Sequence, residues 1–367
     1  MQRVLLIGGY GAFGQTIAQA LAGVDGLDLI IAGRSARKAN ALARKLEVRS
    51  AQLDVTQDLS QPLQTLQPDL VIHCAGPFQK RDYSVAHACI AAGCHYIDLA
   101  DARDFVAGID ALDAQAKARD VAVISGASSV PCLTAAVMDA YLPRFQALES
   151  LHYGISAAQR TARGVATAAS ILTYVGQPFQ ALEVGAPKTV YGWQSLHSVD
   201  YPELGRRWFG DCDVPDLALF PQRYPDLKTL RFAAGNQLAL LHWSTWAVSW
   251  AVRWLGIKGL GKATPLLLGL AKLFDPIGSD KSGFHMIMRG QDAQGKPIEH
   301  RFYLIARQAH GPYIPCIPAI LLAKRLAHGQ ALTPGARPCL DLITLDDYLE
   351  GLAQLDITAI EEGPIDA

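Results

Sequence analysis

The clearest chemical signal in the sequence is a glycine-rich stretch near its start. Gly9-Tyr10-Gly11-Ala12-Phe13-Gly14 matches the pattern G-x-G-x-x-G, follows the apolar run over 4–7 and opens an expected helix over 13–22. In a strand–turn–helix unit, the first glycine permits a tight turn, the second lets a diphosphate approach the backbone, and the third lets the helix pack on the strand. The helix N-terminus adds N–H donors and a favourable dipole. The sequence therefore predicts dinucleotide binding at Gly9, Gly11, Ala12, Phe13 and Gly14.

The end of the second expected strand indicates which dinucleotide binds. An NAD site usually has an acidic residue there, about 20 residues after the glycine loop, which holds the ribose 2′-hydroxyl. This chain has Gly33-Arg34-Ser35 instead. A guanidinium pairs with a 2′-phosphate through charge-assisted hydrogen bonds, and Ser35 and Lys38 would add a donor and a charge. We predict NADP(H), with NAD(H) as the alternative if Arg34 is only a surface residue at a helix start.

Two later loops are expected to complete the cofactor site. Asp54 and Val55 follow the third strand at the adenine edge, although Asp54 also suits an ordinary turn. Ala75-Gly76-Pro77 follows the fourth strand at its carboxyl end, where open α/β sheets bind ligands. We expect this segment near the nicotinamide ribose, and the alternative is a simple Gly-Pro turn.

Candidate catalytic and substrate residues follow the fifth and sixth expected strands. Hydride transfer needs an electrophilic carbon held against the nicotinamide and, usually, one proton donor. Tyr96 would donate a proton, and Asp98 would relay one or orient an amine, whereas a loop hydrogen bond explains Asp98 equally well. Asp101, Ser128 and Ser129 are expected to contact substrate, although the two serines also suit turn positions.

Other candidates carry less information. Arg301 and Arg307 share one face of an expected hairpin strand, where they would bind a substrate carboxylate or belong to a solvated sheet face. No group of Cys, His and Asp residues has the spacing of metal ligands, so we expect no metal. The seven cysteines are scattered, as is usual for reduced structural thiols, and a cytoplasmic protein is expected.

A tryptophan-rich segment over 238–255 stands apart from these motifs. On a helix, four tryptophans fall within an arc of about 80° beside a narrow polar strip. The tryptophans are Trp243, Trp246, Trp250 and Trp254, and the strip is His242, Thr245, Ser249 and Arg253. Because tryptophan favours membrane interfaces, the segment is expected to contact a membrane peripherally or to cover an apolar substrate. The alternative is a helix in the core or in a dimer interface, and the segment is too short to span a bilayer.

The elements that would position these residues alternate regularly over the first 130 residues. We expect strands over 4–7, 27–32, 48–53, 69–74, 95–98 and 121–125, and helices over 13–22, 35–46, 59–66, 82–92 and 105–119. The strands are apolar on both faces, as expected where helices cover both sides of a parallel sheet. The predicted fold class is α/β, a Rossmann-type doubly wound parallel sheet plus an inserted α+β domain.

Length and composition set the domain count and exclude some classes. The chain has 367 residues, which allows two or three domains. We expect an NADP-binding Rossmann domain over 1–130, an α+β substrate and dimerisation domain over 131–317 with a hairpin over 283–307, and C-terminal helices over 318–367 that pack back on the Rossmann domain. A net charge of −1 argues against a nucleic-acid partner, and 50% hydrophobic residues exclude disorder.

Several segments together resemble the saccharopine dehydrogenase family, in its saccharopine-reductase-like Rossmann branch. They span 8–14, 32–34, 75–78, 88–93, 95–98 and 126–131. The resemblance implies NAD(P)-dependent hydride transfer to or from a C=N or C=C bond of a small-molecule substrate, an inserted domain that contacts this substrate, and a homodimer. The tryptophan-rich segment favours an apolar substrate. The alternative is a non-catalytic NADP(H)-binding or membrane-peripheral protein that acts through partners.

Overall fold

The chain folds into two compact units in the computed structural model, which describes residues 1–161 and 164–366. The first unit comprises Met1–Leu133 and Pro312–Ile343, and the second comprises Thr134–Gly311 and Thr344–Ala367. The second unit is therefore mostly one long insertion into the first.

The first unit is built on a parallel sheet whose described strands number seven, in the order β15-β6-β5-β4-β1-β2-β3. The strands are β1 (Gln2–Ile7), β2 (Leu27–Gly33), β3 (Arg49–Gln52), β4 (Leu70–His73), β5 (His95–Asp98), β6 (Ala122–Ser125) and β15 (Gly335–Pro338). The central strands β1 and β4 are apolar and almost wholly buried. The prediction of a doubly wound parallel sheet is confirmed.

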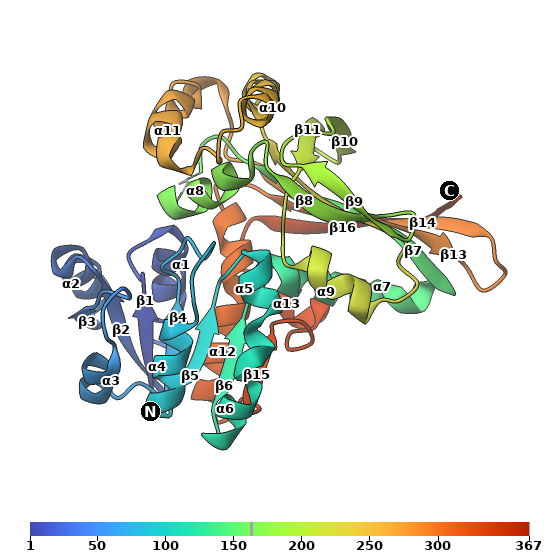
Figure 1. Cartoon of the computed structure of the whole chain (residues 1–367). Helices are drawn as coiled ribbons and strands as arrows, with labels where there is room; N and C mark the ends of the chain where they lie inside the picture. Colours follow the sequence, from blue (N-terminus) through green and yellow to red (C-terminus); the bar gives the residue numbers. More distant parts are fainter. Residues whose placement is uncertain (162–163, 367) are drawn as a thin grey trace. The chain divides into compact units, whose positions relative to one another are not determined.

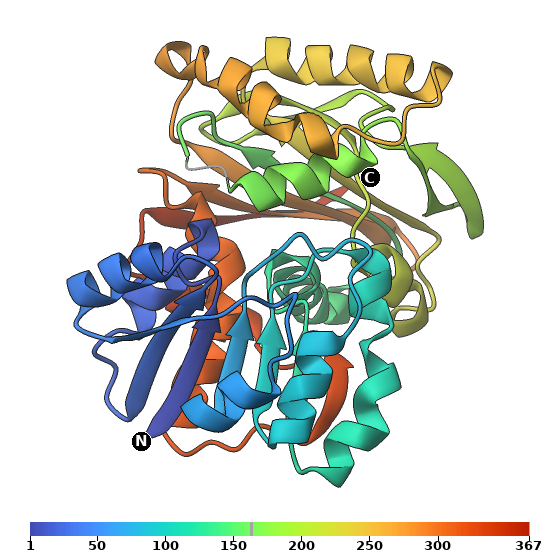
Figure 2. The same cartoon turned by 60° about the vertical axis from the view of Figure 1, so that its left-hand side comes forward.

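Helices cover both faces of this sheet (Figure 1, Figure 2). They are α1 (Ala12–Leu21), α2 (Ala36–Leu46), α3 (Ser60–Leu66), α4 (Ser84–Ala92), α5 (Arg103–Ala107), α6 (Asp113–Ala118) and α12 (Ile317–Ala327). Helix α12 packs on α1 and β1, whereas α4 lies on the opposite face with α3. The helix expected over 105–119 is divided into α5, a short 3-10 turn over Ile109–Leu112, and α6.

The C-terminal part differs from the expectation that residues 318–367 are helices on the Rossmann domain. Helix α12 and strand β15 do belong to the first unit. Helix α13 (Leu345–Leu352) packs on α7 of the second unit, and β16 (Ile357–Asp366) pairs with the edge strand β14 there. The β-branched residues at the start of β16 favour a strand, whereas the sequence analysis included them in the region of C-terminal helices.

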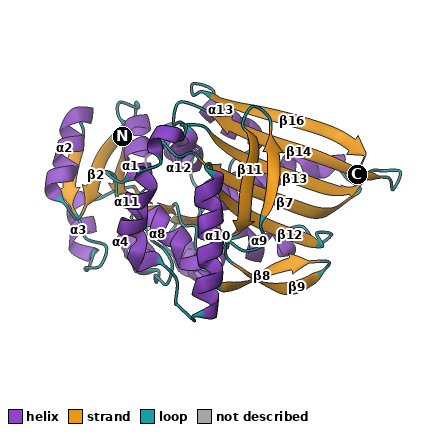
Figure 3. Ribbon diagram, turned by 90° about the horizontal axis from the view of Figure 1, so that it is seen from above, coloured by secondary structure: helices purple, strands orange, loops and turns teal. Residues whose placement is uncertain are grey.

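The second unit is built on a mixed sheet, in the order β10-β11-β12-β7-β13-β14-β16, with the hairpin β8–β9 paired to β12. Its other strands among the described residues are β7 (Ala147–Ala157), β8 (Pro178–Glu183), β9 (Ala186–Tyr191), β10 (His197–Tyr201), β11 (Gly205–Asp211), β12 (Thr229–Asn236), β13 (Ser282–Gln291) and β14 (Pro297–Ala306). Strands β13 and β14 form the hairpin expected over 283–307 (Figure 3).

Helices flank this second sheet on both sides (Figure 1). Helices α7 (Thr134–Tyr141), α9 (Asp216–Arg223) and α13 lie on one side, and α8 (Val165–Tyr174), α10 (Ala239–Trp254) and α11 (Thr264–Lys272) lie on the other. No helix within the described ranges combines the length and the apolar character needed to cross a membrane.

Candidate dinucleotide site

The glycines at the carboxyl end of β1 leave no room for side chains. A Cβ on Gly14 would lie 2.2 Å from the carbonyl oxygen of Gly8 and 2.7 Å from the Cα of Gly9. A Cβ on Gly9 would lie 2.9 Å from the side chain of Ile31. Gly8 has a φ of +79°, and its Cβ would lie 2.9 Å from the backbone nitrogen of Ala75. The start of α1, the glycine loop and the segment after β4 therefore meet backbone to backbone.

The first turn of α1 offers unpaired N–H groups beside this loop. The first helical hydrogen bond runs from the N–H of Gln15 to the carbonyl oxygen of Gly11 at 2.9 Å, and no side chain caps the helix. Among the described residues, the N–H groups of Ala12, Phe13 and Gly14 have no acceptor. Unpaired N–H groups at a helix start, together with the helix dipole, favour an anion such as a diphosphate. The start of α1 can therefore bind the diphosphate that the glycine motif predicts.

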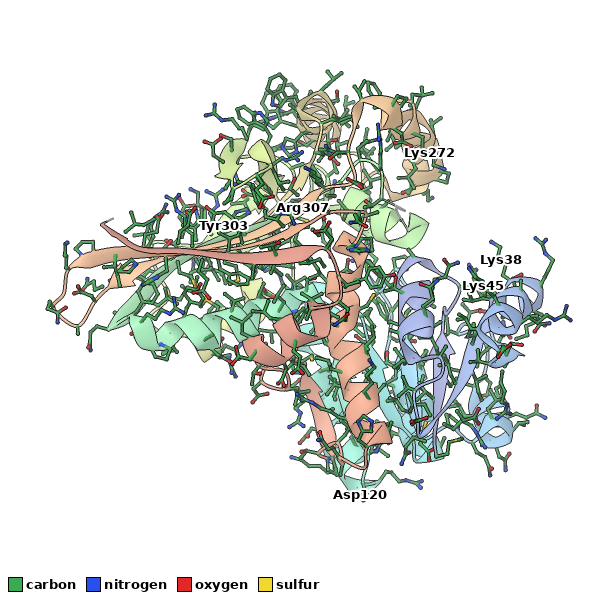
Figure 4. All side chains as sticks on the ribbon, turned by 180° about the vertical axis from the view of Figure 1, so that it is seen from behind. Lys38, Lys45, Asp120, Lys272, Tyr303 and Arg307 are labelled. Atoms are coloured by element: carbon green, nitrogen blue, oxygen red, sulfur yellow. The ribbon has the colours of Figure 1, made fainter. Side chains whose placement is uncertain are left out.

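Positive charge gathers at the end of β2 and the start of α2. Arg34 is exposed, and its carbonyl oxygen accepts a hydrogen bond from the Gln52 amide at 3.1 Å. Ser35 caps α2 by accepting a hydrogen bond from the N–H of Lys38 at 3.4 Å. Lys38 projects outward from the first turn of α2 (Figure 4). Neither Arg34 nor Lys38 forms an ion pair with any residue in the described ranges, so both charges remain available to a phosphate.

Tyr10 lies at the candidate site and is not among the cofactor-binding residues that the sequence analysis predicted. Its hydroxyl accepts a hydrogen bond from the N–H of Ser35 at 2.9 Å, and the Nζ of Lys38 lies 6.0 Å from its ring centroid. A Cβ on Gly33 would lie 2.6 Å from this ring, so the glycine at the end of β2 makes room for the tyrosine. Tyr10 therefore lies at the strand end where the adenosine ribose of a dinucleotide binds. The position of this tyrosine inside the glycine motif was the one sequence feature that could have pointed to it.

The predicted adenine-edge residues form a turn. The carboxylate of Asp54 accepts hydrogen bonds from the N–H and the hydroxyl of Thr56, at 3.0 and 2.9 Å. These two bonds hold the pKa of Asp54 below its usual range, and the nearby Arg34 and Arg81 lower it further. Asp54 thus fits the ordinary-turn alternative, while Val55 lines a small cavity next to it.

The segment after β4 is anchored at both of its ends. The N–H of Cys74 donates to the carbonyl oxygen of Ile7 at 2.8 Å, which ties the segment to β1. Phe78 is buried, and its ring centroid lies 5.0 Å from that of His73 and 5.3 Å from that of Phe105. Ala75, Gly76 and Pro77 lie between these anchors, and Ala75 lies against Gly8 of the glycine loop.

Tyr96 is wholly buried and bonded to a histidine. Its hydroxyl lies 3.0 Å from the Nδ1 of His73, and burial raises its pKa well above the usual value. Burial lowers the pKa of His73 to about 4, so this ring is neutral at neutral pH. Both residues line a cavity of about 20 Å³, enough for a single water molecule. In this structure Tyr96 has no exposed surface for direct contact with a substrate.

Asp98 is also wholly buried, and its hydrogen bonds connect two loops. Its Oδ1 accepts hydrogen bonds from the N–H of Ala100 at 2.9 Å, the N–H of Gly126 at 2.8 Å and the hydroxyl of Ser125 at 3.0 Å. Burial raises the pKa of Asp98 to about 6, although these donors oppose the change. The loop hydrogen-bond interpretation therefore describes the structure, because the carboxyl joins the carboxyl ends of β5 and β6.

The three predicted substrate residues are engaged within the first unit. Asp101 accepts a hydrogen bond from the amide of Gln79 at 3.1 Å, which links the loops after β4 and β5. Ser128 and Ser129 are 8% and 6% exposed, and the N–H of Ser128 donates to the carbonyl oxygen of Gly126 at 2.7 Å. The serines thus occupy a buried turn, which was the alternative interpretation.

The hairpin arginines are both neutralised by acidic residues of the second unit. Arg301 pairs with Glu299 and lies 3.8 Å from Glu362. Arg307 pairs with Glu203 and, at 3.1 Å, with Asp356. The structure therefore does not support a role for these arginines in binding a substrate carboxylate.

Two further expectations concern cysteines and metals. All seven cysteines are free thiols, and Cys74 is the most exposed of them. The described part of the chain contains no group of three or more His, Cys, Asp or Glu residues arranged to hold a metal ion.

Comparison with known proteins agrees with this geometry. The family described as "Saccharopine dehydrogenase NADP binding domain" matches residues 4–166, which include the glycine loop and strands β2 to β6. This match agrees with the resemblance predicted from the sequence. A nicotinamide dinucleotide is accordingly the class of cofactor that the domain takes. Among curated proteins, none matches the chain.

Solved structures extend the likeness beyond this segment. An apo saccharopine dehydrogenase (L-Glu forming) from Saccharomyces cerevisiae is similar with a TM-score of 0.72 and 13% identity, over 99% of this chain and 100% of that one. An amine dehydrogenase from Mycobacterium smegmatis is similar with a TM-score of 0.46 and 12% identity, over 93% and 95% of the two chains. A meso-dapdh mutant from Clostridium tetani E88 gives a TM-score of 0.46 and 15% identity, over 96% and 99%. The yeast structure shows that both units share its fold.

Proposed function

We propose that the protein is an NADP(H)-dependent oxidoreductase that transfers a hydride to or from a C=N or C=C bond of a small molecule. The observation that carries this proposal is the arrangement at the ends of β1 and β2. A loop whose glycines leave no room for side chains and a helix start with free N–H groups adjoin the unpaired cations Arg34 and Lys38. The bound nicotinamide would supply or accept the hydride.

Each part of this arrangement has a separate role in the proposal. The N–H groups of Ala12, Phe13 and Gly14 would bind the diphosphate. Arg34 would pair with the 2′-phosphate of NADP(H), and Lys38 would add charge. No acidic residue stands at the end of β2 to select the 2′-hydroxyl of NAD(H). The preference for NADP(H) therefore rests on charge alone.

Tyr10 is expected to adjust when the cofactor binds. Its hydroxyl already accepts a hydrogen bond from the N–H of Ser35, a backbone donor next to Arg34 in the chain. A phosphate would compete with this hydroxyl for the same N–H group. The loss of one neutral hydrogen bond, about 1 kcal/mol, is offset by one that is charge-assisted.

Tyr96 and Asp98 enter the proposal as positioning residues. Both are fully buried, and Asp98 holds the loops after β5 and β6 together through three hydrogen bonds. His73 and Tyr96 support the start of the segment that contains Ala75, Gly76 and Pro77. These loops lie at the carboxyl ends of the strands, where a ligand of an open α/β sheet binds.

A turnover screen tests the proposed activity. Purified protein is mixed with NADPH and, in turn, with preformed imines, activated alkenes and simple ketones, while the absorbance of the reduced nicotinamide is followed. Oxidation of NADPH that depends on an imine or an alkene is the expected result. Tight NADPH binding without turnover of any of these classes would instead favour a non-catalytic nucleotide-binding protein.

A further inference from the structure

Helix α10 of the second unit presents an apolar stripe to solvent. Exposed residues recur every three or four positions along it, and they include Leu240, Trp243, Ala247, Ala251 and Trp254. Leu240 is 58% exposed and Trp254 is 77% exposed. This spacing follows the helical period, so the residues share one face of the helix. A soluble helix normally turns such a face inward.

Two residues of the polar strip face the protein interior, whereas Arg253 of the same strip is exposed. His242 and Ser249 are both fully buried, and the hydroxyl of Ser249 bonds back to the carbonyl oxygen of Trp246 at 2.6 Å. Helix α10 packs on β11 and β12, where Trp243 meets Trp208 with ring centroids 5.5 Å apart. The usual arrangement of an amphipathic surface helix is thus reversed in α10.

Helix α11 extends the exposed apolar surface. It lies on the same side of the second sheet as α10 (Figure 1, Figure 2). Leu266, Leu270 and Leu273 form a stripe at helical spacing and are 67%, 50% and 73% exposed. Leu255, just after α10, is 73% exposed as well. Large exposed apolar surfaces of this kind mark interaction sites.

The charged residues between Leu238 and Phe274 all carry positive charge. From Leu238 to Phe274 the sequence contains no Asp or Glu. Lys258, Lys262 and Lys272 are exposed and form no ion pair with the described residues, and Figure 4 shows Lys272 on the outer side of α11. Arg253 is held by Gln194 at 3.0 Å and by the ring of Tyr191. Three free positive charges therefore border the exposed leucines and tryptophans.

We propose that α10 and α11 bind the surface of an anionic lipid bilayer peripherally. Tryptophan and leucine enter the boundary between headgroups and acyl chains, while lysines bind anionic headgroups. The length of α10 is about 24 Å, less than the roughly 30 Å of a hydrocarbon core, so the helix would lie in the interface plane. This inference rests on the second unit alone and is independent of the proposed cofactor.

The charge distribution favours lipid over a second copy of the chain. A two-fold interface places the same patch on both partners. The lysines of one copy would then face the lysines of the other, with no acidic residue between Leu238 and Phe274 to pair with them. An anionic bilayer supplies both the missing negative charge and an apolar layer for the two stripes.

Vesicle flotation with the full chain tests the proposal. The probes are phosphatidylcholine vesicles with and without phosphatidylserine. We expect binding to the vesicles that contain phosphatidylserine, weakened by salt. The triple variant Lys258→Gln/Lys262→Gln/Lys272→Gln should bind about 100-fold more weakly, because each lysine contributes about 1 kcal/mol at an anionic surface. The double variant Trp254→Ser/Leu255→Ser should lose at least about tenfold.

Matched variants at exposed positions outside α10 and α11 serve as controls. Lys45→Gln/Lys80→Gln/Lys281→Gln removes three exposed lysines, and Val184→Ser/Leu142→Ser removes two exposed apolar side chains. Both should bind vesicles like the wild type. Quenching of tryptophan fluorescence by brominated lipid should fall in Trp254→Ser/Leu255→Ser and in the triple lysine variant, and it should stay unchanged in both control variants. Absence of binding to either vesicle type overturns the proposal, as does a dimer in solution that Trp254→Ser/Leu255→Ser dissociates while vesicles remain unbound.

Discussion

Helices α2 and α10 are both surface helices, and they face solvent in opposite ways. In α2 the buried residues are Ala39 and Ala43, and the basic residues Lys38 and Lys45 project outward (Figure 4). In α10 the residues with no exposure are His242 and Ser249, whereas apolar side chains lie outside. Both helices show the same 3.6-residue period. Periodicity therefore predicts that a helix has two faces, but it does not by itself predict which face turns inward.

The difference follows from what each helix offers its sheet. One face of α2 carries several charges, so only its alanine face can be buried. No face of α10 before Arg253 carries a full charge at neutral pH, because burial lowers the pKa of His242 to about 4. Packing then decides its orientation, through Trp243 on Trp208 and Arg253 on Tyr191. The dinucleotide site of the first unit and the outer face of α10 should also differ in how strongly they respond to substitution. The following variants test this difference.

Gly14→Ala should have the largest effect. The new Cβ would lie 2.2 Å from a backbone oxygen and 2.7 Å from a backbone carbon, so α1 must shift away from the loop. We expect the affinity for NADPH and NADH to fall by at least about 100-fold, or about 3 kcal/mol. Isothermal titration calorimetry measures this change.

Gly269→Ala in α11 is the matched control. A Cβ at Gly269 meets nothing within 4 Å, so both nucleotides should bind as they do to the wild type. The free energy of unfolding of this variant should also rise by about 0.5–1 kcal/mol, so its midpoint of unfolding should lie at slightly higher denaturant concentration. Equal loss of binding in the two variants would contradict the assignment of the glycine loop.

Asp98→Asn tests whether burial raises the pKa of Asp98 at the carboxyl end of β5, through the pH dependence of stability. The folded pKa of about 6 lies above the usual 3.8, so the folded chain keeps a proton that the unfolded chain has released. This contribution to stability is complete below about pH 4 and is lost as pH rises through 6. The free energy of unfolding of the wild type minus that of Asp98→Asn should fall by about 3 kcal/mol over this window. Urea unfolding at several pH values measures it, and a constant difference would show that burial does not raise the pKa of Asp98 in the folded chain.

Trp254→Ala and Val252→Ala test the reversed orientation of α10. Val252 is 2% exposed and Trp254 is 77% exposed. The smaller truncation should therefore cost more, about 2 kcal/mol for valine against less than about 0.5 kcal/mol for tryptophan. Urea unfolding of both variants measures the difference. A larger loss for the tryptophan variant would mean that the outer face of α10 is covered.

The fold of the first unit was largely predictable because local rules agree with one another there. Apolar strands such as β1 and β4 alternate with helical patterns, and a glycine motif fixes the first crossover. The seventh strand β15 was missed because its residues, Gly335–Pro338, include a glycine, an alanine and a proline, which are depleted in strands. Strand β16 was missed because the helical spacing before it was assumed to continue.

The candidate site was predictable to a similar degree. Arg34, Ser35 and Lys38 follow from their distance to the glycine loop, and the structure leaves both cations unpaired. Tyr10 required knowledge of where its ring packs, which depends on Gly33, more than 20 residues away. The burial of Tyr96 and Asp98 likewise depends on tertiary packing, which the sequence pattern does not show.

The most direct test of the central claim is a titration of NADPH and NADH against the wild type, Arg34→Ala and the control Arg44→Ala. Arg44 is an exposed arginine near the other end of α2. A charge-assisted hydrogen bond contributes about 1.5–3 kcal/mol, so the wild type should prefer NADPH by roughly 10- to 100-fold. Arg34→Ala should remove this preference, and Arg44→Ala should keep it. Equal affinity of the wild type for both nucleotides would contradict the assignment of NADP(H), and binding of neither would contradict the proposed function itself.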